Sequence, residues 1–226
     1  RFWKFLEYKY TREKDLTPLE RRTRILFTKF VGVMVNTGLR PREMLTLRWC
    51  DVSNFKGSNN KSDPKIVVLH IRAEVAKTGV SRNVVAPVKR RLEVIKKSLR
   101  EIGYEVSPED YICVNPMQLD KGSYSRQMFH SRLKDTLELS GLAEEIKNTN
   151  SKISLYSFRH QYICWRLRYG NVPIHLIAKN CGTSIQKIEQ TYGHIETERQ
   201  VDVITKNQGY GRSADVDSST FIGGEN

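Results

Sequence analysis

The chain has 226 residues, enough for one domain with its own hydrophobic core, which excludes a small protein whose fold depends on disulfides. Hydrophobic residues make up 38% and charged residues 28%, and no apolar run approaches the roughly 18 residues that span a bilayer, so we expect no membrane-spanning segment. Lysine and arginine outnumber aspartate and glutamate by 38 to 25, and the net charge of +13 favours nucleic acid as partner.

Acidic and basic residues are distributed unevenly. Residues 195–226 hold three basic and six acidic residues, so residues 1–194 carry +16 against +13 for the whole chain. We expect residues 196–226 to form an acidic, polar tail with a flexible end. The four cysteines have no CxxC pair and no histidine at ligand spacing, which predicts a reducing compartment without zinc or disulfides. Because the chain begins at Arg1 without a signal-like stretch, we expect it to be part of a longer protein.

The first long helix has a clear start and a clear end. Residues 1–16 mix aromatic and charged side chains, and we expect them to be the end of a linker or arm. Thr17, Pro18 and Glu20 form a capping box, and Gly38 is placed to end the helix that follows. Its buried side should carry Ile25, Leu26, Phe30, Val33 and Met34.

A short helix and a β-hairpin come next. Pro41 begins the short helix and leaves Arg40 at the junction between the two helices. Residues 65–72 and 82–88 are rich in β-branched residues and predict a hairpin with Lys77 near its turn, and residues 51–55 are a candidate third strand.

The rest of the chain is helical in pattern as far as the acidic tail. Gly and Asn-Pro signals separate five predicted helices, at 88–102, 125–139, 157–169, 173–180 and 184–193. The predicted fold class is therefore mainly α with a small antiparallel sheet, or α+β.

Three segments carry candidate chemistry. In TGLRPREMLTLRW, residues 37–49, an arginine on a rigid helix junction can direct its planar fork at a phosphate, although most such arginines are simply solvated. In LYSFRHQYICW, residues 155–165, Tyr156 and Arg159 lie one helical turn apart. NCGTSIQKIEQTYGHI, residues 180–195, restarts a helix after Gly182 and places Tyr192 late in it. A lone tyrosine there is more often a half-buried amphipathic residue.

Together, in this order, the segments resemble the tyrosine recombinase (phage integrase) family. Arg40 and Glu43 match its first box, Lys77 matches its hairpin lysine, Arg159 matches its second arginine, and Tyr192 matches its nucleophile. The match extends from residue 17 to 195, which we take as the catalytic domain. The resemblance also implies the catalytic-domain fold of this family and a location in the cytoplasm of a bacterial or phage-infected cell. It further implies an upstream core-binding domain and an assembly of four protomers on two DNA duplexes. The tail would then be a segment that docks on a neighbouring protomer.

Two positions depart from the family pattern. Tyr156 and Thr183 stand where the family usually has histidines, and both keep a hydroxyl that can donate to a phosphate oxygen but does not titrate near neutral pH. We expect His160 to face away from Arg159 and His194 to lie beyond the nucleophile, so that neither replaces the missing histidines. The cleavage rate should then lack a step near pH 6 to 7.

The resemblance implies a metal-free and cofactor-free reaction. Arg40 and Arg159 would clamp the phosphate, Lys77 would protonate the leaving 5′ oxygen, and Tyr192 would hold the 3′ phosphate as a covalent ester. The alternative is that Lys77 is a solvated turn lysine, as hairpin turns commonly carry.

The basic run at residues 89–100 could follow DNA phosphates or form a plain solvated face. The candidate phosphate contacts on this run are Lys89, Arg90, Arg91, Lys96 and Lys97. Two other functions stay open: a type IB topoisomerase, and a DNA-binding module that has lost catalysis. The TGLR box and the short spacing from Arg159 to Tyr192 favour the recombinase.

Overall fold

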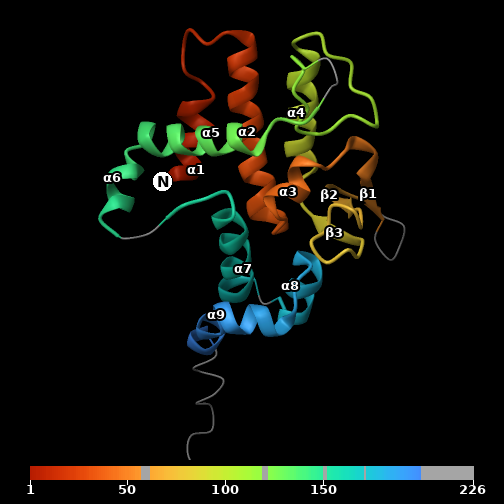
Figure 1. Cartoon of the computed structure of the whole chain (residues 1–226), viewed down its shortest axis with the longest axis vertical. Coiled ribbons are helices and arrows are strands. Elements are labelled where there is room, and N and C mark those ends of the chain that lie inside the picture. The colour runs from red at the N-terminus through yellow and green to blue at the C-terminus, as the bar shows by residue number, and fades with distance from the viewer. Residues whose placement is uncertain (57–61, 119–121, 150–151, 171, 200–226) are drawn as a thin grey trace, which may run out of the picture.

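A computed structural model describes residues 1–56, 62–118, 122–149, 152–170 and 172–199, with side chains except at 55–56, 62–64 and 194–199. The fold is mainly helical with one small sheet, as the sequence predicted (Figure 1). Its elements are α1 (Phe2–Phe5), the π-helix η1 (Leu6–Tyr10), α2 (Pro18–Thr37), α3 (Pro41–Leu45), the 3₁₀ helix η2 (Trp49–Asp51), β1 (Val52–Lys56), β2 (Ser62–Ile71), β3 (Arg82–Ala86), α4 (Lys89–Arg100), α5 (Arg126–Leu139), α6 (Leu142–Lys147), α7 (Ser157–Tyr169), α8 (Ile174–Cys181) and α9 (Ile185–Arg199).

Helix α2 begins and ends at the predicted cap residues, with the Thr17 half of the predicted capping box formed. The Thr17 hydroxyl accepts a hydrogen bond from the Glu20 N–H at 3.2 Å, and Gly38 ends the helix with φ +66°. The predicted buried side is confirmed except at Ile25, which is half-buried, while Phe27 lies fully in the core. Capping and amphipathic spacing therefore act together here, and they end the helix next to Arg40.

The sheet is antiparallel, with strand order β1-β2-β3. Leu69 in the central strand lies opposite Val52 on one side and Val84 on the other. Alternate residues of β2 and β3 point to the same buried face, where α2 and α4 pack against the sheet. The predicted hairpin and its third strand are both confirmed.

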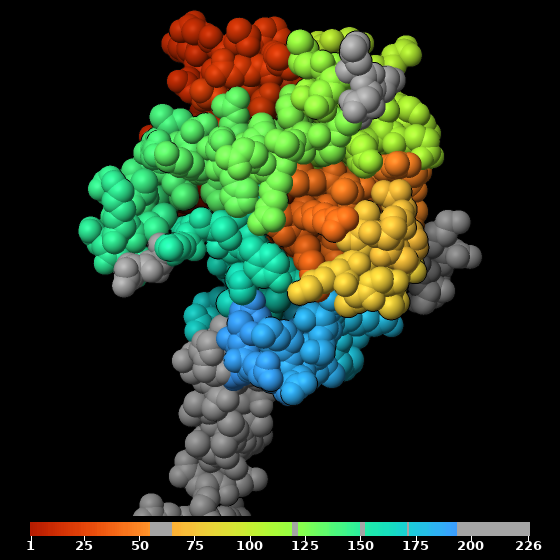
Figure 2. All heavy atoms as spheres, in the orientation of Figure 1, coloured from red at the N-terminus to blue at the C-terminus, as the bar shows by residue number. Residues whose placement is uncertain are grey.

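The core consists of two clusters. The larger one joins α2, the sheet, α4 and α5, and the ring centroids of Phe30 and Phe129 lie 4.3 Å apart within it. The smaller one joins α7, α8 and α9 through Tyr162, Ile163, Leu167, Ile177, Ala178, Cys181, Ile188 and Tyr192. Helices α8 and α9 gather at one end of the molecule, next to the hairpin (Figure 2). The candidate site lies where the two clusters meet.

Two helical regions go beyond the predicted elements. Residues 2–10 are helical, and Leu6 and Tyr10 are buried against the larger cluster. Helix α6 lies in a stretch where the sequence predicted no helix. None of the helices in the described ranges combines the length and the apolar character that crossing a bilayer requires.

Candidate active site

Arg40 is anchored on two sides at the junction between α2 and α3. Its backbone N–H donates to Glu43 Oε2 at 2.8 Å, and its Nη1 donates to Glu43 Oε1 at 2.9 Å. Its Nη2 donates to the carbonyl of Gly182 at 2.7 Å. The chain reaches this position through Gly38, where a Cβ would lie 2.5 Å from the Tyr162 ring. A glycine therefore serves both the positive φ and the close packing.

Glu43 is held between two guanidiniums. Its side chain is fully buried, and Arg82 on β3 makes a bidentate contact with it, at 3.0 Å from Nη1 and 2.8 Å from Nη2. Burial alone would raise the pKa of Glu43. Hydrogen bonds from Arg82 and from the Arg40 backbone, together with both positive charges, outweigh burial and lower this pKa. Glu43 is therefore a buried carboxylate that fixes both arginines.

Arg159 approaches from the first turn of α7 and is only 2% exposed. Its Nη1 donates to the carbonyl of Gly38 and, at 2.9 Å, to the carbonyl of Cys181. Its guanidinium lies over the ring of Tyr156, 5.9 Å from the centroid. This contact confirms the prediction that Tyr156 and Arg159 lie next to each other, one helical turn apart.

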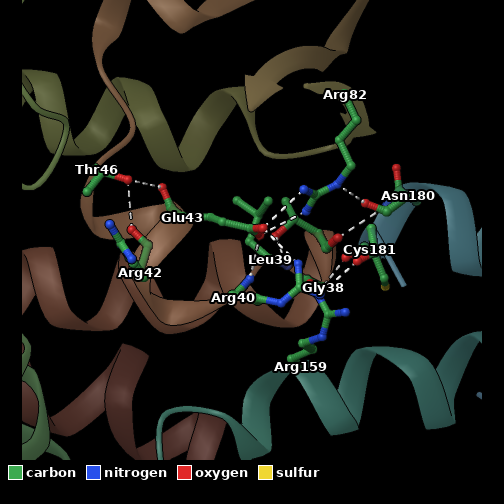
Figure 3. Close-up of polar contacts among 12 residues, drawn as sticks. Gly38, Leu39, Arg40, Arg42, Glu43, Thr46, Arg82, Arg159, Asn180 and Cys181 are labelled. Carbon is green, nitrogen blue, oxygen red and sulfur yellow. Dashed lines mark hydrogen bonds and ion pairs between the residues drawn. The ribbon is translucent and has the colours of Figure 1, made fainter. Parts of the chain in front are cut away.

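The arginines converge on the C-terminal end of α8 (Figure 3). Arg159 and Arg40 bind the adjacent carbonyls of Cys181 and Gly182, and Arg82 Nε donates to the Asn180 carbonyl at 3.1 Å. The partial negative charge at this helix end favours cations. Three guanidiniums against the one carboxylate of Glu43 leave a charge of +2, so the cluster attracts an anion.

Thr183 is on the turn between α8 and α9, directly after these carbonyls. Gly182 has φ +62°, and a Cβ there would lie 2.7 Å from the Arg82 guanidinium. The Thr183 N–H donates to the Ala178 carbonyl at 3.0 Å, and its side chain is half-buried. The turn thus places a hydroxyl-bearing residue at the edge of the arginine cluster.

Tyr192 is on α9 and is only 7% exposed. Its hydroxyl is in hydrogen-bond contact with Nδ1 of His160. Burial raises the pKa of Tyr192, and Arg159 opposes this through its positive charge. Arg159 and Tyr192 therefore share one electrostatic environment.

Residues 8–199 match the phage integrase family. The chain belongs to this family. It is 23% identical over 214 residues to the ICEBs1 integrase of Bacillus subtilis (strain 168), an alignment that covers 91% of this chain and 54% of that protein. The chain thus spans about half the length of this curated relative.

Solved recombinase structures share the fold. The XerH site-specific recombinase bound to difH substrate, in its pre-cleavage complex, superimposes with a TM-score of 0.64 at 17% identity, over 92% of this chain and 53% of that one. The post-cleavage complex gives 0.62 at 15% identity over 91% and 51%. The predicted tyrosine recombinase catalytic-domain fold is therefore confirmed.

The expectation about His160 was wrong for this integrase-family chain. We placed its side chain away from the Arg159 face, but it contacts the Tyr192 hydroxyl. The available signal was its spacing of four residues from Tyr156, which puts both rings on one side of α7, with centroids 5.0 Å apart. The side chain of His194 lies outside the described side chains.

The sequence did not identify Arg82 and Asn180 as residues of the site. Arg82 shares the period-two alternation of Val84 and Ala86, whose side chains face the core, and this alternation was the signal that it points inward. Asn180 donates to the Thr37 carbonyl at 3.1 Å and to the Tyr162 hydroxyl at 2.9 Å. Its role depends on contacts between distant segments and had no local signal.

Lys77 is separate from the arginine cluster. It is exposed on the turn between β2 and β3, and within the described part of the chain its ammonium makes no hydrogen bond or ion pair. Three His, Cys, Asp or Glu side chains that could hold a metal ion do not come together anywhere among the described residues.

Helix α4 runs beside α2 toward the end of the molecule opposite α8 and α9 (Figure 1). Of its candidate DNA contacts, Lys89 is half-buried and Arg90 and Lys97 are exposed. Arg91 instead lies 5.6 Å from the centroid of the Trp3 ring, and burial lowers its pKa. Lys96 lies over the ring of Trp49 at 5.4 Å. On α4, Arg91 and Lys96 therefore lie against aromatic rings, whereas Arg90 and Lys97 are exposed to solvent.

Proposed function

We propose that the chain is the catalytic domain of a site-specific DNA recombinase that cuts and rejoins duplex DNA through a covalent 3′-phosphotyrosine. The observation that carries this proposal is the convergence of Arg40 and Arg159 on the adjacent carbonyls of Cys181 and Gly182, just before the helix of Tyr192. Two fixed guanidiniums at one point suit a phosphodiester, whose attack builds charge on the non-bridging oxygens.

The arginines keep hydrogen-bond donors for such a phosphate. A guanidinium has five N–H groups. In the contacts among described residues, Arg40 uses two on Glu43 and Gly182, and Arg159 uses two on Gly38 and Cys181. Three donors on each remain to stabilise the transition state.

The covalent step needs no nucleotide or metal. Tyr192 attacks phosphorus, its O–H bond breaks as the new O–P bond forms, and the bond to the 5′ oxygen breaks. Lys77, on its exposed turn, would give a proton to that leaving oxygen when DNA brings the two together. A 5′ hydroxyl from another strand can reverse the step, because the phosphotyrosine ester conserves the energy of the broken phosphodiester bond.

The assembly follows from the same proposal. The charge of +16 on residues 1–194 suits duplex DNA, and a core-binding domain elsewhere in the protein would complete the clamp. Four protomers would act on two duplexes, with the acidic tail of each docked on a neighbour.

Trapping of the covalent intermediate tests the function. The substrate is a pool of duplexes taken from the DNA that flanks the gene. Each duplex carries a nick near the cleavage site, so that the short strand with the new 5′ hydroxyl diffuses away after cleavage and cannot reverse it. The wild-type chain should become covalently attached, also in EDTA, whereas Tyr192→Phe should not, with DNA affinity within a few fold.

Three further variants sharpen this test. Arg40→Ala and Arg159→Ala should each slow attachment by about two to three orders of magnitude. The matched control is Tyr169→Phe, because Tyr169 is 67% exposed on α7 and lies outside the site. A stable adduct with Tyr192→Phe would place the nucleophile elsewhere. DNA binding by the wild type without any adduct would favour a module that has lost catalysis.

A further inference from the structure

The contact between His160 and Tyr192 joins two helices at the nucleophile. His160 is on α7 and Tyr192 is on α9, and the Tyr192 hydroxyl meets His160 Nδ1. The two ring centroids lie 5.6 Å apart at an interplanar angle of 51°. Because the same phenolic oxygen would attack phosphorus, the histidine touches the reacting atom itself.

The surroundings keep His160 ready to accept a proton. Burial, and then the positive charge of Arg159, lower the pKa of His160, so the imidazole is neutral near pH 7. A neutral imidazole with its proton on Nε2 has a lone pair on Nδ1. Burial meanwhile raises the pKa of Tyr192, which keeps the phenol protonated and makes a proton acceptor necessary.

The ionisable groups around His160 come from two elements. The Tyr156 ring, at the start of α7, makes a T-shaped contact with the His160 ring, with centroids 5.0 Å apart, and Tyr192 faces His160 from α9. Arg159 is the neighbouring charge that acts on it. Tyr156 occupies the position where the family usually has histidine, so a histidine one turn further along the helix reaches the nucleophile instead.

We propose that His160 is the general base that accepts the Tyr192 proton during DNA cleavage. The proposal rests on the proposed recombinase function. As the Tyr192 oxygen bonds to phosphorus, its proton moves to His160 Nδ1 and the imidazole becomes imidazolium. On rejoining, the attacking 5′ hydroxyl gives its proton back to Lys77, and His160 returns its proton to the departing phenolate, so charge and protons balance over the cycle.

The pH dependence of single-turnover cleavage tests the assignment. The sequence alone predicted a rate without a histidine step near pH 6 to 7. A base at His160 instead predicts a wild-type rate that is level near neutral pH and falls tenfold per pH unit below the lowered pKa of His160, which lies under the ordinary value of about 6.5. His160→Asn keeps an acceptor oxygen near the Nδ1 position but cannot take the proton. This variant should cleave about a hundredfold more slowly at pH 7.5 and lose the acid fall.

A modified substrate separates the base from the general acid. A 5′-bridging phosphorothiolate gives a thiolate leaving group that departs without a proton. This substrate should restore cleavage by the Lys77→Ala variant, which lacks the general acid. Cleavage by His160→Asn should stay slow, because Tyr192 must still lose its proton. His175→Asn is the matched control, since His175 is exposed on α8, and it should behave as wild type.

The outcomes are distinguishable. His160→Asn with a wild-type rate, or a wild-type profile without an acid fall, would overturn the assignment while the adduct still supports a recombinase. The wild-type profile decides the question even if the variant does not fold. If the wild type forms no adduct with either substrate, the proposed function and the assignment fail together.

Discussion

Replacement of Glu43 by Gln should destabilise the protein far more than the loss of one surface charge. The side chain is fully buried and accepts hydrogen bonds from Arg82 and Arg40. Glu43→Gln keeps the shape but leaves two guanidiniums at 10% and 15% exposure without their counter-charge. Breaking such a buried pair costs about 3–5 kcal/mol. For a chain of this size, this corresponds to a fall in Tm of about 6–20 °C.

The assay is the free energy of unfolding, measured by urea titration as a function of pH. Because the pKa of Glu43 is lower in the folded protein than in the unfolded chain, its stabilising contribution is full above about pH 4.3. The contribution is lost as the pH falls through the folded-state pKa. The difference between wild type and Glu43→Gln should therefore be largest near neutral pH and shrink on acidification.

Glu109→Gln is the matched control. Glu109 also pairs with an arginine, Arg48, at 3.1 Å, but its side chain is 71% exposed, so its loss should cost under about 1 kcal/mol. Equal costs for Glu43→Gln and Glu109→Gln, or a difference that does not change with pH, would refute the view that a buried carboxylate holds the arginine cluster.

Two further predictions concern DNA. Affinity for duplex DNA should fall steeply with salt, because a +16 body releases several counterions on binding, and a flat plot of log K against log salt between about 50 and 200 mM would contradict a phosphate footprint. Tyr156→Phe and Thr183→Val should each slow cleavage by about ten- to a hundredfold, or about 1.4–2.7 kcal/mol, as expected for one hydrogen bond to a charged group. Unchanged single-turnover rates in both would mean that these side chains only pack.

Most of the secondary structure was predictable from local signals. The capping box at Thr17 and the left-handed Gly38 bound α2 on sequence alone. Gly193 was expected to end the last helix, but α9 continues through it to Arg199, because this glycine does not adopt a positive φ. Residues 2–10 mix charge with aromatic rings, and only the tertiary packing of Leu6 and Tyr10 makes them part of the core.

The candidate site was predictable to the extent that its residues belong to contiguous boxes. Arg40, Arg159 and Tyr192 stand in such boxes, and the structure brings the first two to one helix end. Arg82 was missed because its partner Glu43 is 39 residues away in sequence. His160 was missed because its rotation was judged against Arg159 on its own helix, whereas the partner that matters comes from α9.

The way in which the arginines are held explains how the site accommodates two departures from the family pattern. Arg40 and Arg159 are anchored by main-chain carbonyls of Gly38, Cys181 and Gly182, and Arg40 also by Glu43. None of these anchors is a side chain at position 156 or 183. The usual histidines can therefore be replaced there by Tyr156 and Thr183 without release of either guanidinium. The same backbone anchors tie the arginines to the turn before α9, so any shift of this turn moves the cluster and the tyrosine helix together.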